Sequence, residues 1–134
     1  MSPELTMTLR LLLAALLGGV IGLQREKAGK PAGLRTHMLI CIGATLFTLV
    51  GIYAFNGGIA DPSRVAAGVV TGIGFLGAGA IIFRSSDGYV TGLTTAATMW
   101  AVGGIGMAVG AGLYIAAAIT TAIILIILFI PHLK

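Results

Sequence analysis

The sequence predicts an all-α, polytopic membrane protein, with residues 1–134 forming a single transmembrane domain of five bundled helices. Two observations lead to this class. Of the 134 residues, 57% are hydrophobic and only 9% are charged, whereas soluble domains carry about a quarter charged residues. The uncharged residues also gather in runs long enough to cross a bilayer. This composition excludes a soluble domain and a disordered tail. It also excludes a nucleic-acid-binding protein, because eight basic residues scattered among apolar runs form no basic face.

The uncharged runs give five expected spans, in chain order 5–23, 36–55, 65–83, 92–109 and 113–130. The first span contains Arg10 and follows Glu4, which argues against a cleaved signal peptide. The last two spans share one run, 88–131, that holds no charged residue. As a single helix this run would be about 66 Å long, roughly twice the thickness of a bilayer core. We therefore expect a reversal at Gly110-Ala111-Gly112, because glycine adopts the left-handed conformations that end helices.

The connections between spans carry turn residues and most of the charge. Asp61-Pro62-Ser63 is typical of a helix N-cap followed by proline, and Ser86-Asp87-Gly88 is typical of a turn. The connection 24–35 holds half of all the Lys and Arg residues in the chain: Arg25, Lys27, Lys30 and Arg35. Short loops with such an excess stay in the cytoplasm. We therefore expect the N-terminus outside and the C-terminus in the cytoplasm.

Glycine is the most prominent residue type, with 21 in the chain. Small residues four positions apart let membrane helices approach closely. On this basis the expected helix-packing positions are Gly18, Gly22, Gly68, Gly72, Gly74, Gly77, Gly79, Gly106 and Gly110. The stretch 72–79 has a second interpretation, a pliable helix that lines a site. Its match to G-x-G-x-x-G lies inside a span, so we do not interpret it as a nucleotide site.

Charged residues at the outer border form the first group of candidate functional residues. Arg10, Asp61 and Arg64 are expected at similar depth, and a cluster of the three is one hypothesis. The simpler interpretation is that Arg10 extends to the surface and Asp61 caps the third span.

The inner border provides the second group: Arg25, Glu26, Arg35, Thr36 and His37. The simplest interpretation is a solvated, positive-inside loop. The alternative is a surface that binds a cytoplasmic or membrane partner, or lipid phosphate.

Threonines form the third group. Thr91, Thr94, Thr95 and Thr98 recur at helical spacing and would share one helix face. Their hydroxyls are expected to bond to carbonyls of their own helix or to neighbouring helices, or else to line a polar cavity.

Catalytic and metal-binding patterns are missing from the sequence. There is no Ser-His-Asp constellation, no Cys/His cluster and no Walker loop, and no carboxylate falls inside an expected span. We therefore expect no enzymatic activity, no catalytic residues, no metal ligands and no cofactor.

Three ordered blocks then carry a family resemblance. They are Gly22–Glu26 with Ala32–His37, Asp61–Ala66 leading into Val70–Gly79, and Gly92–Trp100 followed by Gly106 and Gly110. Together they resemble the signature of the MgtC/SapB family of bacterial inner-membrane proteins, over roughly residues 8 to 130. Trp100, at the end of the third block, joins the functional candidates.

The resemblance implies adaptation to low magnesium and, in pathogens, virulence and survival inside macrophages. It also implies action on the F-type ATP synthase rather than transport of Mg²⁺. Many members continue into a cytoplasmic regulatory domain, which this sequence lacks, so we expect either a short member or a shortened form. The preferred hypothesis is a multi-pass regulator in the bacterial inner membrane. Its expected partners are the lipid bilayer, a second copy of the chain (a dimer is favoured) and the ATP synthase or another membrane protein. The alternative is a small transporter or channel for Mg²⁺ or another ion.

Overall fold

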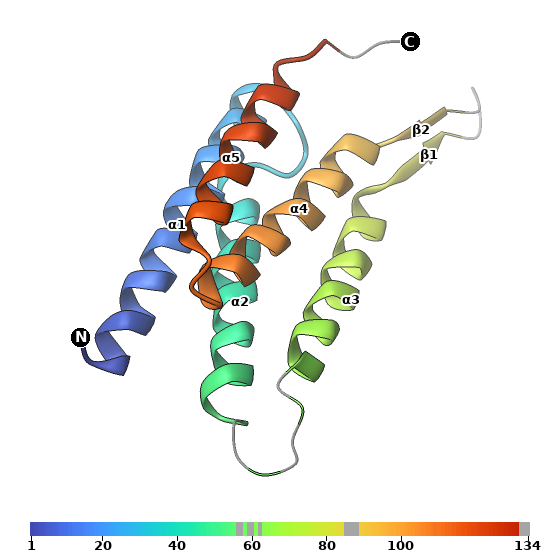
Figure 1. Cartoon of the computed structure of the whole chain (residues 1–134). Coiled ribbons are helices and arrows are strands. Elements are labelled where there is room, and N and C mark those ends of the chain that lie inside the picture. Colours follow the sequence, from blue (N-terminus) through green and yellow to red (C-terminus); the bar gives the residue numbers. More distant parts are fainter. Residues whose placement is uncertain (56–57, 59–60, 62, 85–88, 132–134) are drawn as a thin grey trace.

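The computed structural model describes residues 1–55, 58, 61, 63–84 and 89–131, with the backbone alone at 83, 84 and 89. It confirms the all-α class, because five helices and one small hairpin make up the described part of the chain (Figure 1). The helices are α1 (Pro3–Lys27), α2 (Leu34–Tyr53), α3 (Ser63–Ala80), α4 (Leu93–Gly110) and α5 (Tyr114–Leu128). The strands β1 (Ile82–Arg84) and β2 (Tyr89–Thr91) lie between α3 and α4.

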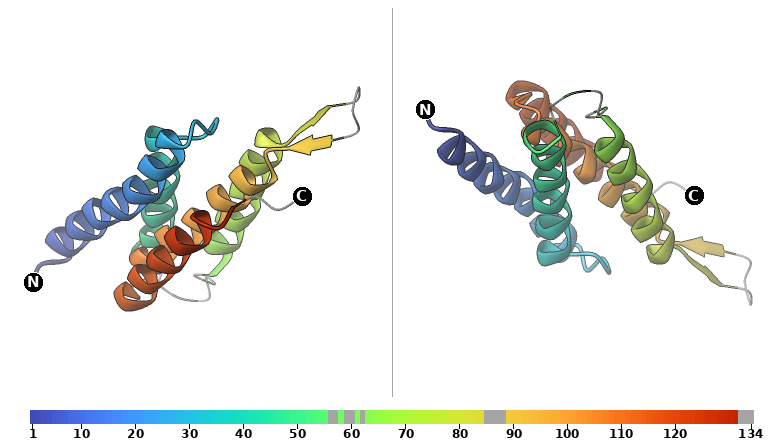
Figure 2. Two further views of the ribbon diagram at one scale, coloured as in Figure 1. Left: turned by 90° about the horizontal axis from the view of Figure 1, so that it is seen from above. Right: turned by 90° about the horizontal axis from the view of Figure 1, so that it is seen from below.

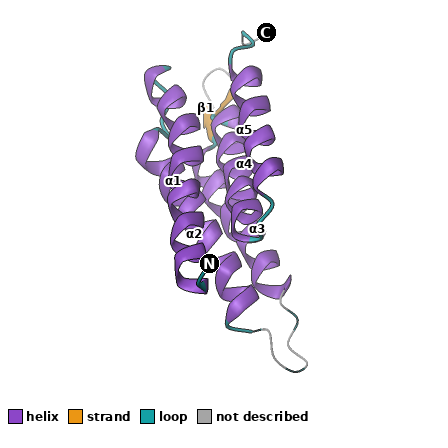
Figure 3. Cartoon of the chain, turned by 60° about the vertical axis from the view of Figure 1, so that its left-hand side comes forward, coloured by secondary structure: helices purple, strands orange, loops and turns teal. Residues whose placement is uncertain are grey.

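Four helices, α1 to α4, are long and apolar enough to cross a membrane, and α5 is a shorter apolar helix of 15 residues. The helices run up and down through the bundle (Figure 3). The connection between α1 and α2 lies at the same end as the hairpin, and the N-terminus lies at the opposite end (Figure 1). This arrangement agrees with the alternation of the five expected spans. The number of spans in the bilayer and the inside–outside orientation stay predictions.

The first connection is shorter than the sequence indicates. Span one was expected to end at residue 23, but α1 continues to Lys27, since Gln, Arg and Glu are good helix formers. Gly29, with φ of 73°, then ends the helix, and the chain re-enters a helix at Leu34. Arg25 is therefore a helical residue rather than a loop residue.

The region after α3 differs most from expectation. The third span was expected to reach residue 83, but α3 ends at Ala80 and the chain forms a β-hairpin, with Ile82 opposite Thr91. Ile and Phe favour extended strands over helix. Gly92, with φ of 88°, then turns the chain into α4, and a Cβ at this position would collide with the Ala80 carbonyl. Thr91 consequently lies in β2 and not on the expected helix face. The turn expected at 86–88 lies outside the described residues.

The reversal in the long uncharged run lies where the sequence predicts it. Helix α4 ends at Gly110, Gly112 has φ of 84°, and α5 begins at Tyr114. The left-handed conformation of Gly112 lets the chain turn back within three residues.

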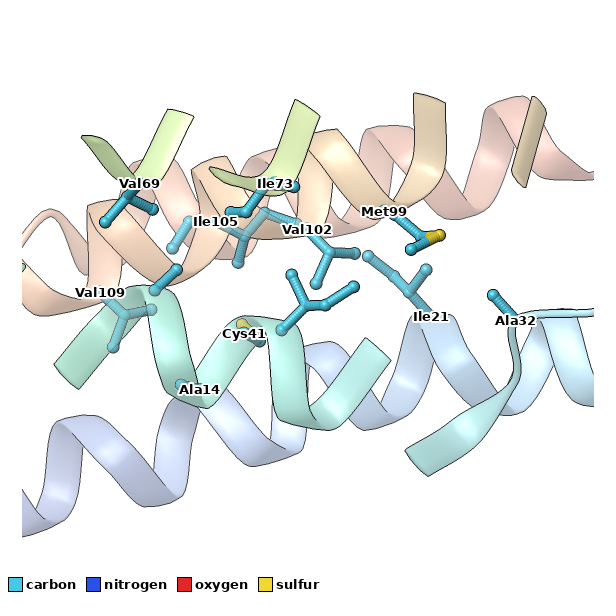
Figure 4. Close-up of a cluster of buried hydrophobic side chains, with 13 residues drawn as sticks. Ala14, Ile21, Ala32, Cys41, Val69, Ile73, Met99, Val102, Ile105 and Val109 are labelled. Atoms are coloured by element: carbon cyan, nitrogen blue, oxygen red, sulfur yellow. The ribbon is translucent and has the colours of Figure 1, made fainter. Parts of the chain in front are cut away.

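Helix α4 contacts all four other helices, and α2 contacts α1, α3 and α4 (Figure 2). The fully buried Cys41 of α2 packs in one apolar cluster with Ala14 and Ile21 of α1 and with Val102 and Val109 of α4 (Figure 4). The buried side chains are small or branched, and they allow the backbones of α1, α2 and α4 to come close.

Two glycine pairs make these close approaches. A Cβ on Gly18 would lie 2.7 Å from the Cβ of Cys41, and one on Gly22 would lie 2.8 Å from the Cα of Leu34. In α4, a Cβ on Gly106 would collide with the carbonyl oxygen of Cys41, and one on Gly110 would lie 2.9 Å from a carbonyl oxygen of α2. Each pair therefore holds its helix directly against the backbone of α2.

The glycines of α3 are placed differently. A Cβ on Gly77 would make ordinary contact with Ala96 at 3.5 Å. By contrast, Gly68, Gly72, Gly74 and Gly79 have open space where a Cβ would stand. These four glycines therefore make no close helix contact within the described part of the chain, and helix packing at their positions stays a prediction.

Candidate functional site

The most unusual buried side chain is the guanidinium of Arg25. Positions 14, 18, 21 and 25 of α1 are all buried at heptad spacing, so this stripe carries Arg25 into the bundle, where it is 4% exposed. Its Nη2 donates a hydrogen bond to Oγ1 of Thr95, 3.0 Å away at the start of α4. This contact joins the end of α1 to the first turn of α4.

His37 lies beside this contact on the buried stripe of α2 and is fully buried. Its Nδ1 is 2.9 Å from the carbonyl oxygen of Gly33. Because a carbonyl only accepts, Nδ1 carries the proton in this contact. We call Arg25, His37 and Thr95, together with Gln24, which precedes Arg25 in α1, the Arg25 cluster.

Three buried polar atoms of the Arg25 cluster have no hydrogen-bond partner among the described residues. They are Oε1 of Gln24, Nε of Arg25 and Nε2 of His37. Each such atom costs about 1–3 kcal/mol relative to the hydrated group. A buried guanidinium whose partner among the described residues is a neutral hydroxyl costs more. The cluster is thus a cationic, under-satisfied site.

The remaining inner-border candidates lie outside the cluster. Arg35 is exposed and Thr36 is half-buried. Glu26 is exposed, and its Oε1 accepts the backbone N–H of Leu34 at 3.3 Å, capping α2. The solvated-loop interpretation therefore fits Glu26 and Arg35 but is wrong for Arg25 and His37, because both lie on buried helix stripes.

The three residues of the hypothetical outer cluster do not form one ionic group among the described contacts. The backbone N–H of Arg64 donates to the Asp61 carbonyl at 3.2 Å, but Arg10 bonds to other residues. Nε of Arg10 donates to the Tyr114 hydroxyl at 2.7 Å, and its Nη1 donates to the Gly110 carbonyl at 2.9 Å. The guanidinium also lies 5.6 Å from the centre of the Tyr114 ring. Arg10 thereby clamps the reversal between α4 and α5 instead of pairing with Asp61.

Asp61 has a local role at the start of α3. Its Oδ1 accepts the hydroxyl of Ser63 at 2.7 Å and the backbone N–H of the same residue at 2.9 Å. These two bonds hold the pKa of the Asp61 carboxyl below its usual value. Arg64 follows, exposed, in the first turn of α3. The simpler interpretation, local capping, therefore fits Asp61, while Pro62 lies outside the described residues.

The four threonines expected on one helix face differ in their surroundings. Thr95 and Thr98 are buried on α4, whereas Thr94 is exposed. Thr98 donates to the carbonyl of Thr94 at 2.7 Å, a bond back to its own helix. Thr95 accepts from another helix, as described above.

Trp100 is 56% exposed and lines a shallow pocket of about 390 Å³ between α3, α4 and α5. Its other walls include Ile73 and Ala117. This pocket is apolar and adds no group that could perform chemistry.

A larger groove runs between α2 and α3. It has a volume of about 650 Å³ and an apolar lining. Leu39, Gly43 and Phe47 line it on the α2 side. Gly68 and Gly72 line it on the α3 side, and nothing lies within 4 Å of the place where a Cβ would stand on either, or on Gly43. The groove therefore gives direct access to helix backbone. We call it the α2–α3 groove.

Metal-ligating side chains do not gather in the part of the chain that the structure describes, where no three His, Cys, Asp or Glu residues come together.

Sequence reasoning did not select three residues that matter here: Gln24, Thr45 and Tyr114. Thr45 is fully buried and donates to the Gly106 carbonyl at 2.7 Å. A heptad stripe extended from Ala14 to residue 25 would have placed Arg25 inside the bundle. No comparable sequence signal connects Tyr114 with Arg10, which is 104 residues away.

The fold and site define a polytopic α-helical membrane protein with a buried cationic cluster at one end of the bundle. The chain belongs to the MgtC family, whose model matches residues 11–133.

Three relatives illustrate the similarity. The chain is 45% identical over 130 residues to the "Putative magnesium transporter YhiD" of Escherichia coli K12, covering 92% of this chain and 60% of YhiD. It is 41% identical over 130 residues to Protein SapB of Bacillus subtilis, covering 92% of this chain and 56% of SapB. It is 47% identical over 113 residues to Protein MgtC of Brucella abortus, covering 84% of this chain and 45% of MgtC. The chain thus spans about half the length of these relatives. No solved structure matches it significantly.

Proposed function

We propose that this chain is a non-enzymatic regulator in the bacterial inner membrane that holds a transmembrane helix of a partner protein in the α2–α3 groove. The observation that carries the proposal is the groove itself, which is apolar and has glycine backbone exposed on both of its walls. In a lipid environment, contact between helices depends on close packing, and backbone exposed by glycine provides it.

The dimensions of the groove suit a helix. Along α3 its lining extends from Val65 to Leu76, which corresponds to about 16 Å, or three helical turns. Gly68 and Gly72 lie one turn apart on this wall, and Gly43 lies on the opposite wall. A partner helix with small residues at matching spacing would approach both walls closely. The hydroxyl of Ser63 and the carboxylate of Asp61 form the polar start of α3. The contact between a partner helix and α3 would therefore begin after them, at Val65.

The partner that family membership favours is the F-type ATP synthase, restrained when magnesium is scarce. In a pathogen such restraint would support virulence and survival inside macrophages. A helix of a second copy of this chain is the other candidate occupant of the groove. Such binding would be detected as a dimer.

Magnesium transport is the second candidate function, since the relative YhiD carries the name of a magnesium transporter. The position of Arg25 weighs against it. A divalent cation that entered the bundle at this end would meet a buried positive charge, which repels it.

The experiment compares two substitutions of open glycines on the same helix. Gly72→Leu fills the α2–α3 groove, whereas Gly74→Leu adds the same side chain at a position that does not line it. Each chain is purified from membranes, and co-purified ATP synthase and dimer are quantified. We expect ATP synthase with the unmodified chain and with Gly74→Leu, and at least a tenfold loss with Gly72→Leu. Equal capture by both variants would refute the groove, and a dimer lost only with Gly72→Leu would assign the groove to self-association.

The transport alternative is tested with purified protein in liposomes. Saturable Mg²⁺ flux above that of protein-free liposomes would favour a transporter and contradict the proposal. We expect no such flux.

A further inference from the structure

The Arg25 cluster holds positive charge that the described residues 1–55, 63–84 and 89–131 do little to neutralise. Arg25 is 4% exposed, and its hydrogen-bond partner is the neutral hydroxyl of Thr95. The neighbouring carboxylate of Glu26 is exposed and accepts the N–H of Leu34 instead. A guanidinium removed from water in this way strongly favours an anion beside it.

Two helix N-termini lie at the cluster. His37 lies in the first turn of α2, and Thr95 lies in the first turn of α4. The carboxylate of Glu26 caps α2, whereas no side-chain hydrogen bond caps α4 at its N-cap residue Gly92. The positive end of the α4 dipole therefore adds to the charge of the cluster.

The three unpartnered atoms specify what would satisfy the site. Nε of Arg25 is a donor, and Oε1 of Gln24 is an acceptor. Nε2 of His37 accepts when the ring is neutral, because Nδ1 then donates to Gly33, and it donates when the ring is protonated. A ligand that satisfies the site must therefore accept a hydrogen bond from the guanidinium of Arg25. A ligand that also donates a hydrogen bond would satisfy Oε1 of Gln24.

We propose that the Arg25 cluster binds a phosphate group. Phosphate oxygens accept from guanidinium groups in short, charge-assisted hydrogen bonds. A phosphate that carries a P–OH group can also donate to Oε1 of Gln24. Inorganic phosphate and phosphomonoesters meet both requirements, whereas the phosphodiester of a membrane lipid meets only the first. The two sources share one chemistry and differ in this single hydrogen bond.

The first arm tests free phosphate. The full chain in detergent is titrated with sodium phosphate at constant ionic strength, and the thermal unfolding temperature is followed. We expect a saturable rise for the unmodified chain and an apparent Kd at least tenfold weaker for Arg25→Gln. The matched control is Arg35→Gln, which removes the same charge from an exposed position nearby and should bind as the unmodified chain does. A rise that both substitutions weaken equally would overturn the proposal, and an absent rise would exclude free phosphate as the source of the phosphate group.

Two further measurements keep the proposal testable if Arg25→Gln does not fold. Gln24→Leu retains the guanidinium and removes the acceptor, so it should weaken inorganic phosphate binding but not lipid phosphodiester binding. In the second arm, lipid nanodiscs with and without phosphatidylglycerol replace detergent. Stabilisation only by phosphatidylglycerol, lost with Arg25→Lys or Arg25→Gln but kept with Arg35→Gln, would assign the site to lipid. No binding in either arm would refute the site.

This inference does not depend on the proposed partner. Gly72→Leu changes the α2–α3 groove and leaves the Arg25 cluster untouched, so it should bind phosphate normally. Loss of partner binding and loss of phosphate binding are therefore distinguishable.

Discussion

The guanidinium of Arg25 donates a hydrogen bond to the hydroxyl of Thr95, 3.0 Å away, although 70 residues separate them. This bond connects the last two turns of α1 with the first turn of α4 on the side opposite the reversal between α4 and α5. Arg10 makes the corresponding connection near that reversal, through Tyr114. Two arginines of α1 therefore hold α4 at both of its ends, and Arg10 also holds the start of α5.

Replacing Thr95 with valine should destabilise the protein. The substitution keeps the shape of the side chain and removes the acceptor for a buried, charged donor, which costs about 1–2 kcal/mol. Thermal unfolding in detergent measures the change. Thr94→Val is the matched control, because Thr94 is exposed on the same helix turn and should leave stability unchanged. Equal stability of both variants would mean that the bond contributes nothing.

Replacing Gly106 with alanine should separate α2 from α4. The added Cβ would collide with the carbonyl oxygen of Cys41 and lie 2.9 Å from the Cβ of Ala44. The shift would also stretch the hydrogen bond from Thr45, and we expect a loss of about 1–3 kcal/mol. Gly104→Ala, on the open side of α4, should be neutral or slightly stabilising. Comparable losses in the two variants would indicate a general intolerance of α4 rather than a close contact.

Replacing Tyr114 with phenylalanine should loosen the reversal between α4 and α5. The ring remains beside Arg10, but the hydroxyl that accepts from Nε is lost, at a cost of about 0.5–1.5 kcal/mol. Hydrogen exchange of the amides from 111 to 117 should become faster. Tyr53→Phe, at the end of α2, is the control. Unchanged exchange would show that the clamp is not needed to hold the reversal.

The start of α3 should respond to acid through Asp61. Its folded-state pKa is lowered by the bonds from Ser63, so its stabilising effect is present above the unfolded pKa of about 3.9 and is lost as the pH falls below it through the folded pKa. Asp61→Asn keeps an oxygen acceptor but cannot titrate in this range. Exchange of the Ser63 amide should therefore depend on pH below about 4 more strongly in the unmodified chain than in the variant. Identical pH profiles would show that ionisation of the Asp61 carboxyl does not stabilise the start of α3.

Much of the fold was predictable because apolar runs and glycine positions are local signals. The reversal near Gly112 and the class of the protein follow from such signals alone. The hairpin after α3 was missed because the apolar residues 81–83 are compatible with either helix or strand, and the pairing of Ile82 with Thr91 decides between them.

The candidate site was predictable only in part. Arg25, His37 and Thr95 were named from the sequence, but their convergence was not, because charge alone favoured a solvated loop. Burial of Arg25 follows from the heptad stripe of α1, which overrides the preference of an arginine for water. The α2–α3 groove was not predictable, because it depends on the distance between α2 and α3. Glycines four positions apart pack closely against α2 in α4 but leave open backbone in α3.

The most direct test of the regulator measures ATP-driven proton pumping by the F-type ATP synthase in membrane vesicles that contain increasing amounts of this chain. We expect the pumping rate to fall with the unmodified chain and with Gly74→Leu, and to remain at its original value with Gly72→Leu. A pumping rate that does not change with the unmodified chain would contradict the account.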